Sequence, residues 1–431
     1  MSSVCSCQTE NMETEKLSRE FLSKMEMDIR EGRIDDVVSK LETVPVEKIA
    51  REARLPLANF CRRVGLPLLG LKILAPVVGP ARTSRPLNAE LSEYALLLQR
   101  CGAVDEASRI LESLNPKKYP DVLLNRAFIR FNEWDFAKAI ELLRAYLEMP
   151  ISSSARNFGR LNLARALVTS GQAAEALELL ASLAGAPGLV ASCHELRAQC
   201  HVALGDLAAA KADLPEAVKT GGRSFAVEKW QAVIDARESG SVEPLERFRN
   251  EAFALGDWEN VRFADYQASF VAFDEGRYRQ LLYGTPWRRF RAHAQKNLGR
   301  AIGETELVYG NPAGRKVDLV RGTVDGMAFM APGEASHTVL MTLLRDFYKP
   351  TSIGQLFSVL MPGEDFDPSK SPALVQRALV RTRQLLMDFN LPIEIQAGPQ
   401  GISLALGEGV CILIPFDRMP ASAAIALKRA G

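Results

Sequence analysis

Apolar residues recur along the first two-thirds of this chain at spacings of three and four, in short segments interrupted by glycine. In one such stretch Leu161, Ala164 and Leu167 precede Gly171, and a further apolar segment starts at Ala176. Spacing of this kind places apolar side chains on one face of an α-helix. The pattern therefore predicts an amphipathic helix, a tight turn at the glycine, and a second amphipathic helix.

This helix–turn–helix pattern repeats at intervals of 30 to 39 residues. In the clearest copies an alanine follows the glycine by five residues, and another alanine precedes it by seven. The glycine stands at 102, 171 and 205 in the clear copies and at 32, 65, 240 and 276 in looser ones, and Asn132–Ala137 is expected to be a copy with asparagine in place of glycine. A fixed period of this length is typical of stacked repeats, each of which needs its neighbours to bury its apolar face.

The small residues of the repeat have separate structural roles. Glycine permits the left-handed backbone conformation that ends a helix, and alanine on the facing helices lets their backbones approach closely. Prolines at 116, 150 and 187 fall where a helix must stop. We expect these positions to hold helix pairs together and to bind no ligand themselves.

The positions resemble the tetratricopeptide repeat family over about residues 20–300. In that family's pattern a Gly-x-x-x-x-Ala turn follows a small residue and a proline ends the unit, whereas the family's tryptophan and tyrosine in the first helix are mostly missing here. The resemblance implies a right-handed superhelix whose concave face binds a peptide or protein partner. A rigid spacer that binds nothing is the alternative.

The stretch 277–300 contains seven basic residues and no acidic one, with four aromatic residues between them. We expect it to form a basic helix at the end of the repeats. Such a patch fits a contact with phosphate groups or with an acidic protein, and a solvated helix that caps the array explains the same residues. The candidate contact residues are Arg288, Arg289, Arg291, Lys296 and Arg300.

The pattern changes after about residue 303, where short apolar segments alternate with glycine and proline. Strands are predicted at 306–309, 316–320, 326–330, 393–396, 402–406 and 410–414, and helices at 337–348, 352–360 and 372–390. An acidic loop, 362–370, joins the last two helices. The sequence Gly398-Pro-Gln-Gly401 predicts a hairpin turn between two of the strands.

Strands, three helices and a hairpin follow one another in the order of a winged helix, and these elements resemble the OmpR/PhoB-type output domain of bacterial response regulators. The resemblance implies that the third helix enters the DNA major groove, while the hairpin and the loop contact the DNA backbone or polymerase. The candidate DNA- or partner-binding residues are Arg377, Arg381, Gln384 and the neighbouring Arg383. The helical spacing places Asp388 on the same exposed stripe, opposite a predicted buried face that comprises Leu374, Ala378, Leu385 and Phe389.

Charge weakens the DNA interpretation. The 431-residue chain has a formal net charge of +1, and from Arg300 onward 13 basic residues balance 13 acidic ones. DNA binding usually depends on an excess of positive charge, and winged helices also serve as protein-binding modules. A protein-binding winged helix therefore remains the alternative.

The search for catalytic chemistry finds no phosphate-binding loop, dinucleotide fingerprint or nucleophile elbow. Cys193-His194 and Cys200-His201 are seven residues apart, which separates them by about 10 Å along a helix, too far for one zinc ion. Cys5 and Cys7 are a chance pair or a soft-metal site in a polar tail, and the seven scattered cysteines fit a reducing cytoplasm. We expect no enzyme, cofactor, metal, signal peptide or membrane contact.

The sequence thus predicts a mainly α fold, an α–α helical-hairpin solenoid followed by an α+β winged-helix domain. The expected domains are a disordered tail at 1–19, the repeat array at 20–300 and the winged helix at 301–431. The expected function is that of a bacterial regulatory protein whose array binds a protein and whose winged helix binds DNA or transcription machinery. A scaffold in which both parts bind protein is the alternative.

Overall fold

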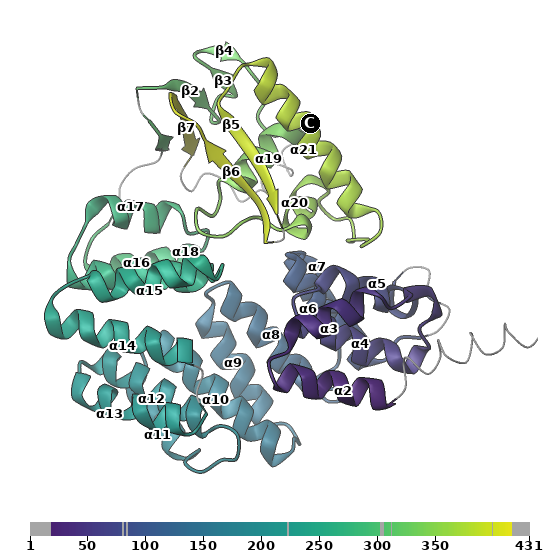
Figure 1. Cartoon of the computed structure of the whole chain (residues 1–431), viewed down its shortest axis with the longest axis vertical. Coiled ribbons are helices and arrows are strands. Elements are labelled where there is room, and N and C mark those ends of the chain that lie inside the picture. Colours follow the sequence, from purple (N-terminus) through teal and green to yellow (C-terminus); the bar gives the residue numbers. More distant parts are fainter. Residues whose placement is uncertain are drawn as a thin grey trace, which may run out of the picture. The chain divides into compact units, whose positions relative to one another are not determined.

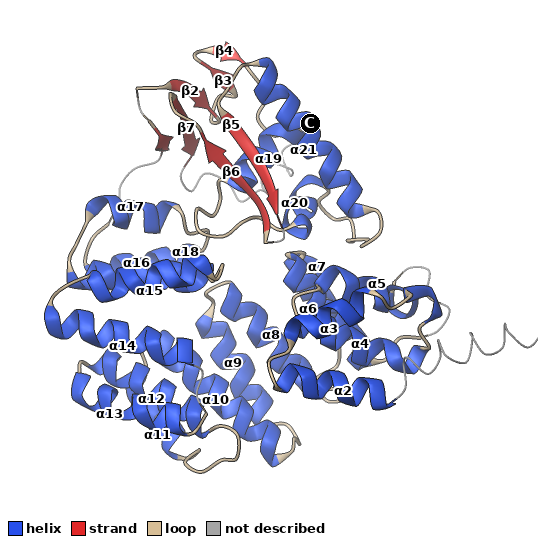
Figure 2. Ribbon diagram, viewed as in Figure 1, coloured by secondary structure: helices blue, strands red, loops and turns tan. Residues whose placement is uncertain are grey.

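The computed structural model describes residues 19–79, 82, 85–221, 224–301, 306–311, 313–398 and 400–415. The predicted tail at 1–19, with Cys5 and Cys7, lies outside the described residues except for Arg19, where helix α2 begins. Helices dominate the described chain, and the strands lie in its C-terminal third (Figure 2). Within the described residues, no helix has both the length and the apolar content needed to cross a bilayer.

The described chain forms two compact units, each built from two separate segments. The first unit contains residues up to 115 together with 353–375, and the second contains 116–352 together with the chain from 376. The predicted boundary at residue 300 remains a prediction.

The first unit consists of three helix pairs and one helix from the C-terminal third of the chain. Its elements are α2 (Arg19–Arg30), α3 (Ile34–Glu42), a 3₁₀ turn (Val46–Lys48), α4 (Arg51–Arg63), α5 (Pro67–Val78), α6 (Asn88–Cys101), α7 (Val104–Ser113) and α20 (Ile353–Leu360). The segment 353–375 packs on the α6–α7 pair within this unit.

The second unit begins with further helix pairs, which follow one another from blue to teal in Figure 1. They comprise α8 (Asp121–Asn132), α9 (Phe136–Leu147), α10 (Ser153–Thr169), α11 (Ala173–Ala181), α12 (Val190–Leu204), α13 (Leu207–Lys219), α14 (Ser224–Ser239), α15 (Glu243–Ala254), α16 (Trp258–Val271), α17 (Glu275–Tyr283) and α18 (Arg288–Leu298). We call α8, α10, α12, α14 and α16 the first helices, because each opens a pair. From α10 to α16, each first helix contacts the next one.

The predicted roles of the repeat residues are confirmed at most turns. Glycines 32, 65, 102, 171, 205 and 240 all have positive φ, between 69° and 89°. The alanines five residues after the three clearest glycines, and those seven residues before them, are completely buried. Glycine thus ends the first helix, and the alanines form the contact between the two helices of a pair.

The predicted copy at Asn132–Ala137 is wrong by two residues. Asn132 is still helical, and Trp134 is the residue with positive φ, at 57°. Counting from Trp134, the small residues five after and seven before are Ala139 and Ala127, and both are completely buried. The repeat spacings around this turn become 32 and 37 residues instead of 30 and 39. A tryptophan in the left-handed region is rare, so the sequence pattern concealed the true turn.

The expected turn at Gly276 is also wrong, because this glycine lies inside α17. Helix α16 ends instead at Ala272, whose backbone is extended, and Asp274 caps the next helix by accepting a hydrogen bond from the N–H of Arg277. The expected single basic helix over 277–300 is likewise two helices, α17 and α18. Gly284 lies between them at a close approach, where a Cβ atom would stand 2.6 Å from the carbonyl oxygen of Gln280.

The strands of the C-terminal third form one five-stranded sheet and one hairpin. The sheet contains β1 (Glu306–Gly310), β2 (Arg315–Asp318), β3 (Thr323–Val324), β4 (Met327–Ala328) and β7 (Val410–Pro415), in the order β1-β7-β2-β3-β4. The last strand of the described chain, β7, thus lies inside the sheet, antiparallel to β1 and parallel to β2. The predicted hairpin is confirmed as β5 (Ile393–Gly398) and β6 (Gly401–Leu406).

The three predicted helices of this region are present as α19 (Ala335–Leu343), α20 and α21 (Ser371–Asp388). Helix α19 ends five residues earlier than expected, because the chain from Leu344 to Ser352 turns away and buries Tyr348 among residues of α16, α17 and α18. Thr351 in this segment forms a β-bridge with Ile402 of the hairpin. The order of elements is the predicted one, and their assignment as a winged helix remains a prediction.

Candidate functional site

The predicted stripe on α21 is exposed. Arg377, Arg381, Gln384 and Asp388 all face solvent, and the side-chain amide of Gln384 donates a hydrogen bond to Asp388 over 2.8 Å. The buried face of the helix differs from the predicted one by one position, because the fully buried residues are Val375, Leu379, Thr382 and Leu386. Thr382 occupies a core position because its hydroxyl donates a hydrogen bond to the carbonyl of Ala378.

Arg383, which was expected beside the stripe, holds α21 to the hairpin. Its Nε and Nη2 donate hydrogen bonds of 3.1 and 2.9 Å to the carbonyl oxygen of Ile395 in β5. The guanidinium of Arg383 therefore makes hydrogen bonds within the protein. The hairpin itself offers no positive charge, since residues 393–408 include Glu394 and Glu408 and no lysine or arginine.

Most of the candidate residues in the junction stretch, 277–300, contact other residues of the second unit. Arg289 pairs with Asp135 at 3.0 Å, and Arg291 donates a hydrogen bond to the carbonyl of Thr285. The guanidinium of Arg300 stands 3.7 Å from the ring centre of Phe273. Lys296 is exposed, and Arg288 also has an interaction partner. These contacts leave less positive charge for a phosphate ligand than the sequence indicates.

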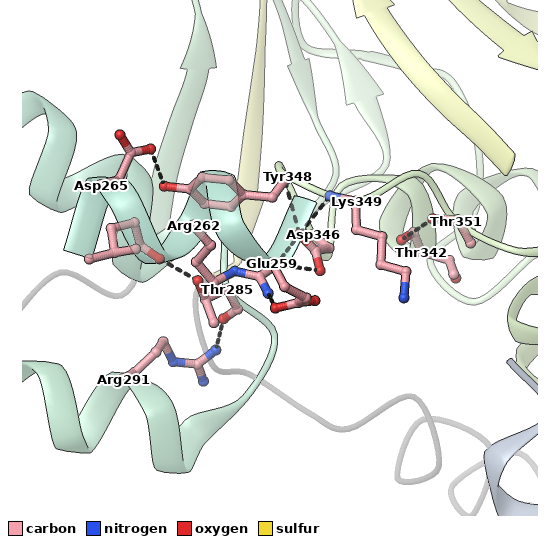
Figure 3. A network of polar contacts seen from close by, with 11 residues as sticks. Glu259, Arg262, Asp265, Thr285, Arg291, Thr342, Asp346, Tyr348, Lys349 and Thr351 are labelled. Atoms are coloured by element: carbon pink, nitrogen blue, oxygen red, sulfur yellow. Dashed lines mark hydrogen bonds and ion pairs between the residues drawn. The ribbon is translucent and has the colours of Figure 1, made fainter. Parts of the chain in front are cut away.

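A buried polar network joins α16 to the segment that follows α19 (Figure 3). Arg262 is 2% exposed, and its Nη2 donates to both carboxylate oxygens of Asp346 at 2.7 Å. Its guanidinium lies between the rings of Trp287 and Tyr348, 4.4 and 5.0 Å from their centres. The Tyr348 hydroxyl donates to Asp265, which also accepts from Arg249. The network fixes the C-terminal part of this unit to its last repeat helices.

A continuous series of aromatic rings links helices α10, α8, α9, α18 and α16, with successive centroids 4.6 to 6.4 Å apart. We call it the aromatic row, and in order it consists of Phe158, Phe128, Phe131, Phe136, Trp134, Phe290, Tyr266 and Phe270. Its two ends, Phe158 on α10 and Phe270 on α16, are 42% and 40% exposed. An accessible aromatic side chain therefore stands at each end of a packed series of rings, each on a first helix.

The aromatic row also connects the first helix pair of the second unit to its last helix, α18. Trp134, in the turn of the first pair of that unit, packs edge-on against Phe290 of α18 at 4.6 Å. The Asp135–Arg289 ion pair lies beside this contact. The beginning and the end of the helical array in this unit are thus in contact.

Lys229 of α14 is a candidate functional residue that the sequence did not indicate. Its ammonium stands 3.9 Å from the ring centre of Phe263 on the neighbouring first helix and 5.5 Å from that of Trp230. Burial lowers the pKa of Lys229 to about 8, although the negative charges of Glu195 and Asp257 act in the opposite direction. Apart from the adjacent Trp230, the residues that act on Lys229 lie on other elements, so only the fold brings them together.

The two Cys-His pairs do not form a metal site in the described part of the chain, where no cluster of metal-binding side chains occurs. Cys193 and Cys200 are buried, and burial raises the pKa of both thiols. The two histidines instead share Asp213 of α13, at 2.9 Å from His194 and 3.7 Å from His201.

Comparisons with known proteins show a similarity for part of the repeats. Residues 95–236 match the profile of the tetratricopeptide repeat-like domain, and this range includes the turns at Gly102, Trp134, Gly171 and Gly205. A crystal structure of a tetratricopeptide repeat protein from Parabacteroides merdae shares 16% identity, covers 63% of this chain and 97% of its own, and aligns with a TM-score of 0.38. A search of curated proteins gave no match. Residues 95–236 are therefore similar to the tetratricopeptide repeat-like domain.

Proposed function

We propose that this protein is a non-enzymatic interaction protein whose repeat array binds a protein partner along its first helices. The observation that carries the proposal is the aromatic row, which exposes Phe158 at one end and Phe270 at the other. Aromatic side chains are enriched at protein interfaces, because they bury a large area with few rotatable bonds. The tetratricopeptide-like fold is consistent with a role in protein–protein interaction.

Capture of partners by the tagged full chain tests this proposal. We expect the double variant Phe158→Ser/Phe270→Ser to lose the proteins that the wild type retains, with and without nuclease treatment. Phe253→Ser is the matched control, because Phe253 is 58% exposed but lies on α15, the second helix of its pair. Equal capture by the double variant and the wild type would show that the first helices are not the binding surface.

A second candidate function is DNA binding by the C-terminal region, as in a bacterial transcription regulator. It is favoured by the exposed stripe of Arg377, Arg381 and Gln384, since arginine pairs with guanine and glutamine with adenine. The balanced charge of this region and the absence of basic residues at 393–408 favour a protein ligand instead.

A gel-shift assay of the full chain with duplex DNA at low salt separates the two candidates. DNA binding predicts a shifted band that disappears in Arg377→Ala/Arg381→Ala. No shift, or a shift that the double variant leaves unchanged, would exclude the stripe as a DNA contact and leave the protein-binding scaffold.

A further inference from the structure

The segment 353–375 packs closely on the α6–α7 pair within the first unit. A Cβ atom at Gly354 would stand 2.5 Å from the carbonyl oxygen of Cys101, so α20 approaches the end of α6 at a distance that only glycine permits. Phe366, from the acidic loop after α20, is 2% exposed and packs against Phe357 with ring centroids 5.4 Å apart. The segment that docks on α6–α7 thus carries a buried aromatic side chain.

Two polar contacts beside Phe366 define the chemistry of this docking. The backbone N–H of Phe366 donates a 2.7 Å hydrogen bond to the carboxylate of Glu106 on α7. One turn further along α7, Arg109 pairs with Asp365 at 2.7 Å. Helix α7 therefore contacts an acidic side chain and the backbone N–H of the next residue, whose phenyl ring is buried against Phe357 of α20. The docked segment thus presents an acidic residue followed by a buried phenylalanine.

We propose that the α6–α7 pair is a peptide-docking site, occupied in this chain by its own loop, whose partner in trans is an extended protein segment with a phenylalanine flanked by acidic residues. The partner segment displaces residues 364–368, where the sequence is Glu-Asp-Phe-Asp-Pro. The inference rests on the proposed function in one respect, that the repeats bind protein. It adds a second binding surface and the chemistry of its ligand.

Two polar contacts of the docked loop favour its exchange. Burial raises the pKa of Glu106 to about 7, and Asp365 adds to the rise while Arg109 opposes it. The Arg109–Asp365 pair is exposed on both sides, and exposed pairs contribute little to stability. The ionisable groups that act on Glu106 are Arg109 on α7 and Asp365 on the loop, and Tyr94 of α6 interacts electrostatically with Glu106 and also with Asp365, Asp367 and Cys101. At neutral pH and above, burying the ionised carboxylate costs free energy that release of the loop recovers.

Fluorescence anisotropy with a labelled peptide of residues 361–370 tests the proposal on the full chain. In the wild type the tethered loop competes at a high effective concentration, on the order of millimolar. The variant Phe366→Ala vacates the site, so we expect it to bind the peptide at least ten-fold more tightly than the wild type. Adding Arg109→Glu should weaken this binding about ten-fold, and a peptide with lysine at the position of Asp365 should restore it.

A second variant is needed because Phe366→Ala changes a buried residue and could unfold the protein. Asp365→Arg replaces the attraction to Arg109 by repulsion without changing a buried residue. It should shift the loop toward release, so peptide binding should be tighter than in the wild type. A peptide with alanine in place of phenylalanine is the matched control and should not bind. Failure of both folded variants to bind, or equal binding to the wild type and the variants, would overturn the proposal.

The same variants show whether the docking site or the first-helix surface is at fault when one of the two proposals fails. Peptide binding should be unchanged by Phe158→Ser/Phe270→Ser, whose residues lie in the other unit. Loss of partner capture with intact peptide binding would therefore reject the first-helix surface alone, and the reverse result would reject the docking site alone.

Discussion

At the scale of single residues, two ionisable side chains are held where their charged forms are poorly solvated. Glu106 lies in the contact between α7 and the acidic loop, and Lys229 lies over the ring of Phe263. Burial disfavours the charged form of either group, so it raises the pKa of an acid and lowers that of a base. Both residues therefore make the stability of the fold depend on pH. Rising pH lowers stability through Glu106 and raises it through Lys229, each in its own pH range.

Substitution of Glu106 by glutamine should stabilise the protein above neutral pH. The native pKa of Glu106, about 7, lies above its ordinary value of 4.5, so the native state holds a proton that the unfolded state releases between these values. Wild-type stability should therefore fall as pH rises from about 4.5 to about 7.

Glutamine is neutral at all pH values and its oxygen still accepts from Phe366. At pH 8 we expect a gain on the order of 2 to 3 kcal/mol, since one pKa unit corresponds to about 1.4 kcal/mol. Urea unfolding of Glu106→Gln at pH 5 and pH 8 measures it, with exposed Glu52→Gln as the control. A gain of equal size at both pH values would show that the carboxylate is not perturbed.

Replacement of Lys229 by methionine should stabilise the protein at neutral pH. The native pKa, about 8, lies below the ordinary 10.5, so between these values the unfolded state holds more protons and wild-type stability rises with pH. Methionine keeps the packing on Phe263 and removes the charge. We expect a gain on the order of 2 kcal/mol at pH 7 that shrinks toward pH 10.

Thermal unfolding at pH 7 and pH 10 measures this effect, with exposed Lys24→Met as the matched control. A gain that does not change with pH would contradict the buried-ammonium account. Lys229 and Glu106 could not be singled out from the sequence, because burial by distant parts of the chain shifts their pKa values and an isolated lysine or glutamate carries no local pattern.

At the scale of elements, the periodicity of small and apolar residues predicted most of the helix pairs. Glycines at 102, 171 and 205 adopt the expected left-handed conformation, and their alanine partners are buried as expected. The pattern failed at Trp134 and Ala272, since these turns use no glycine. The stripe on α21 was predicted from helical spacing, whereas the contacts of Arg383 and Arg289 could not be, because their partners lie on distant elements.

A pair of glycine substitutions tests the account of the turns. Gly171 has φ of +89° and Gly398 does not have positive φ, while a Cβ atom at either position would meet no neighbour within 4 Å. Gly171→Ala should therefore cost about 1 to 2 kcal/mol through the backbone alone, and Gly398→Ala should be nearly neutral. Equal costs in chemical unfolding would contradict a conformational role for Gly171.

At the scale of the whole molecule, each compact unit combines segments that lie far apart in the sequence. The segment 353–375 belongs with the first helix pairs, and β7 completes the sheet of β1 and β2. The sequence pattern predicted strands after about residue 303, and the first described strand begins at Glu306. The pattern could not show which earlier helices the later elements would contact. Such long-range pairing depends on shape complementarity, as at Gly354, which a local pattern does not contain.

The contact between Trp134 and Phe290, which joins the two ends of the helical array in the second unit, can be tested by hydrogen exchange. Trp134→Ala removes the ring that packs on Phe290, so amide exchange should rise both around residues 131–137 and in α18. Aromatic pairs of this kind contribute about 1 kcal/mol beyond their burial. Phe253→Ala, which removes a ring from a local pair with Trp258, should affect only its own surroundings. Unchanged exchange in α18 would show that the contact between Trp134 and Phe290 has little energetic weight.

The most direct test of the central claim, that the first helices bind a protein, is the affinity of a captured partner measured by isothermal titration. Truncation of a hot-spot aromatic at an interface costs about 2 kcal/mol or more, which is about a thirty-fold loss of affinity. We predict a loss of at least ten-fold for Phe158→Ser/Phe270→Ser and less than two-fold for Phe253→Ser. Unchanged affinity in the double variant, or a larger loss in the Phe253 control, would contradict the claim.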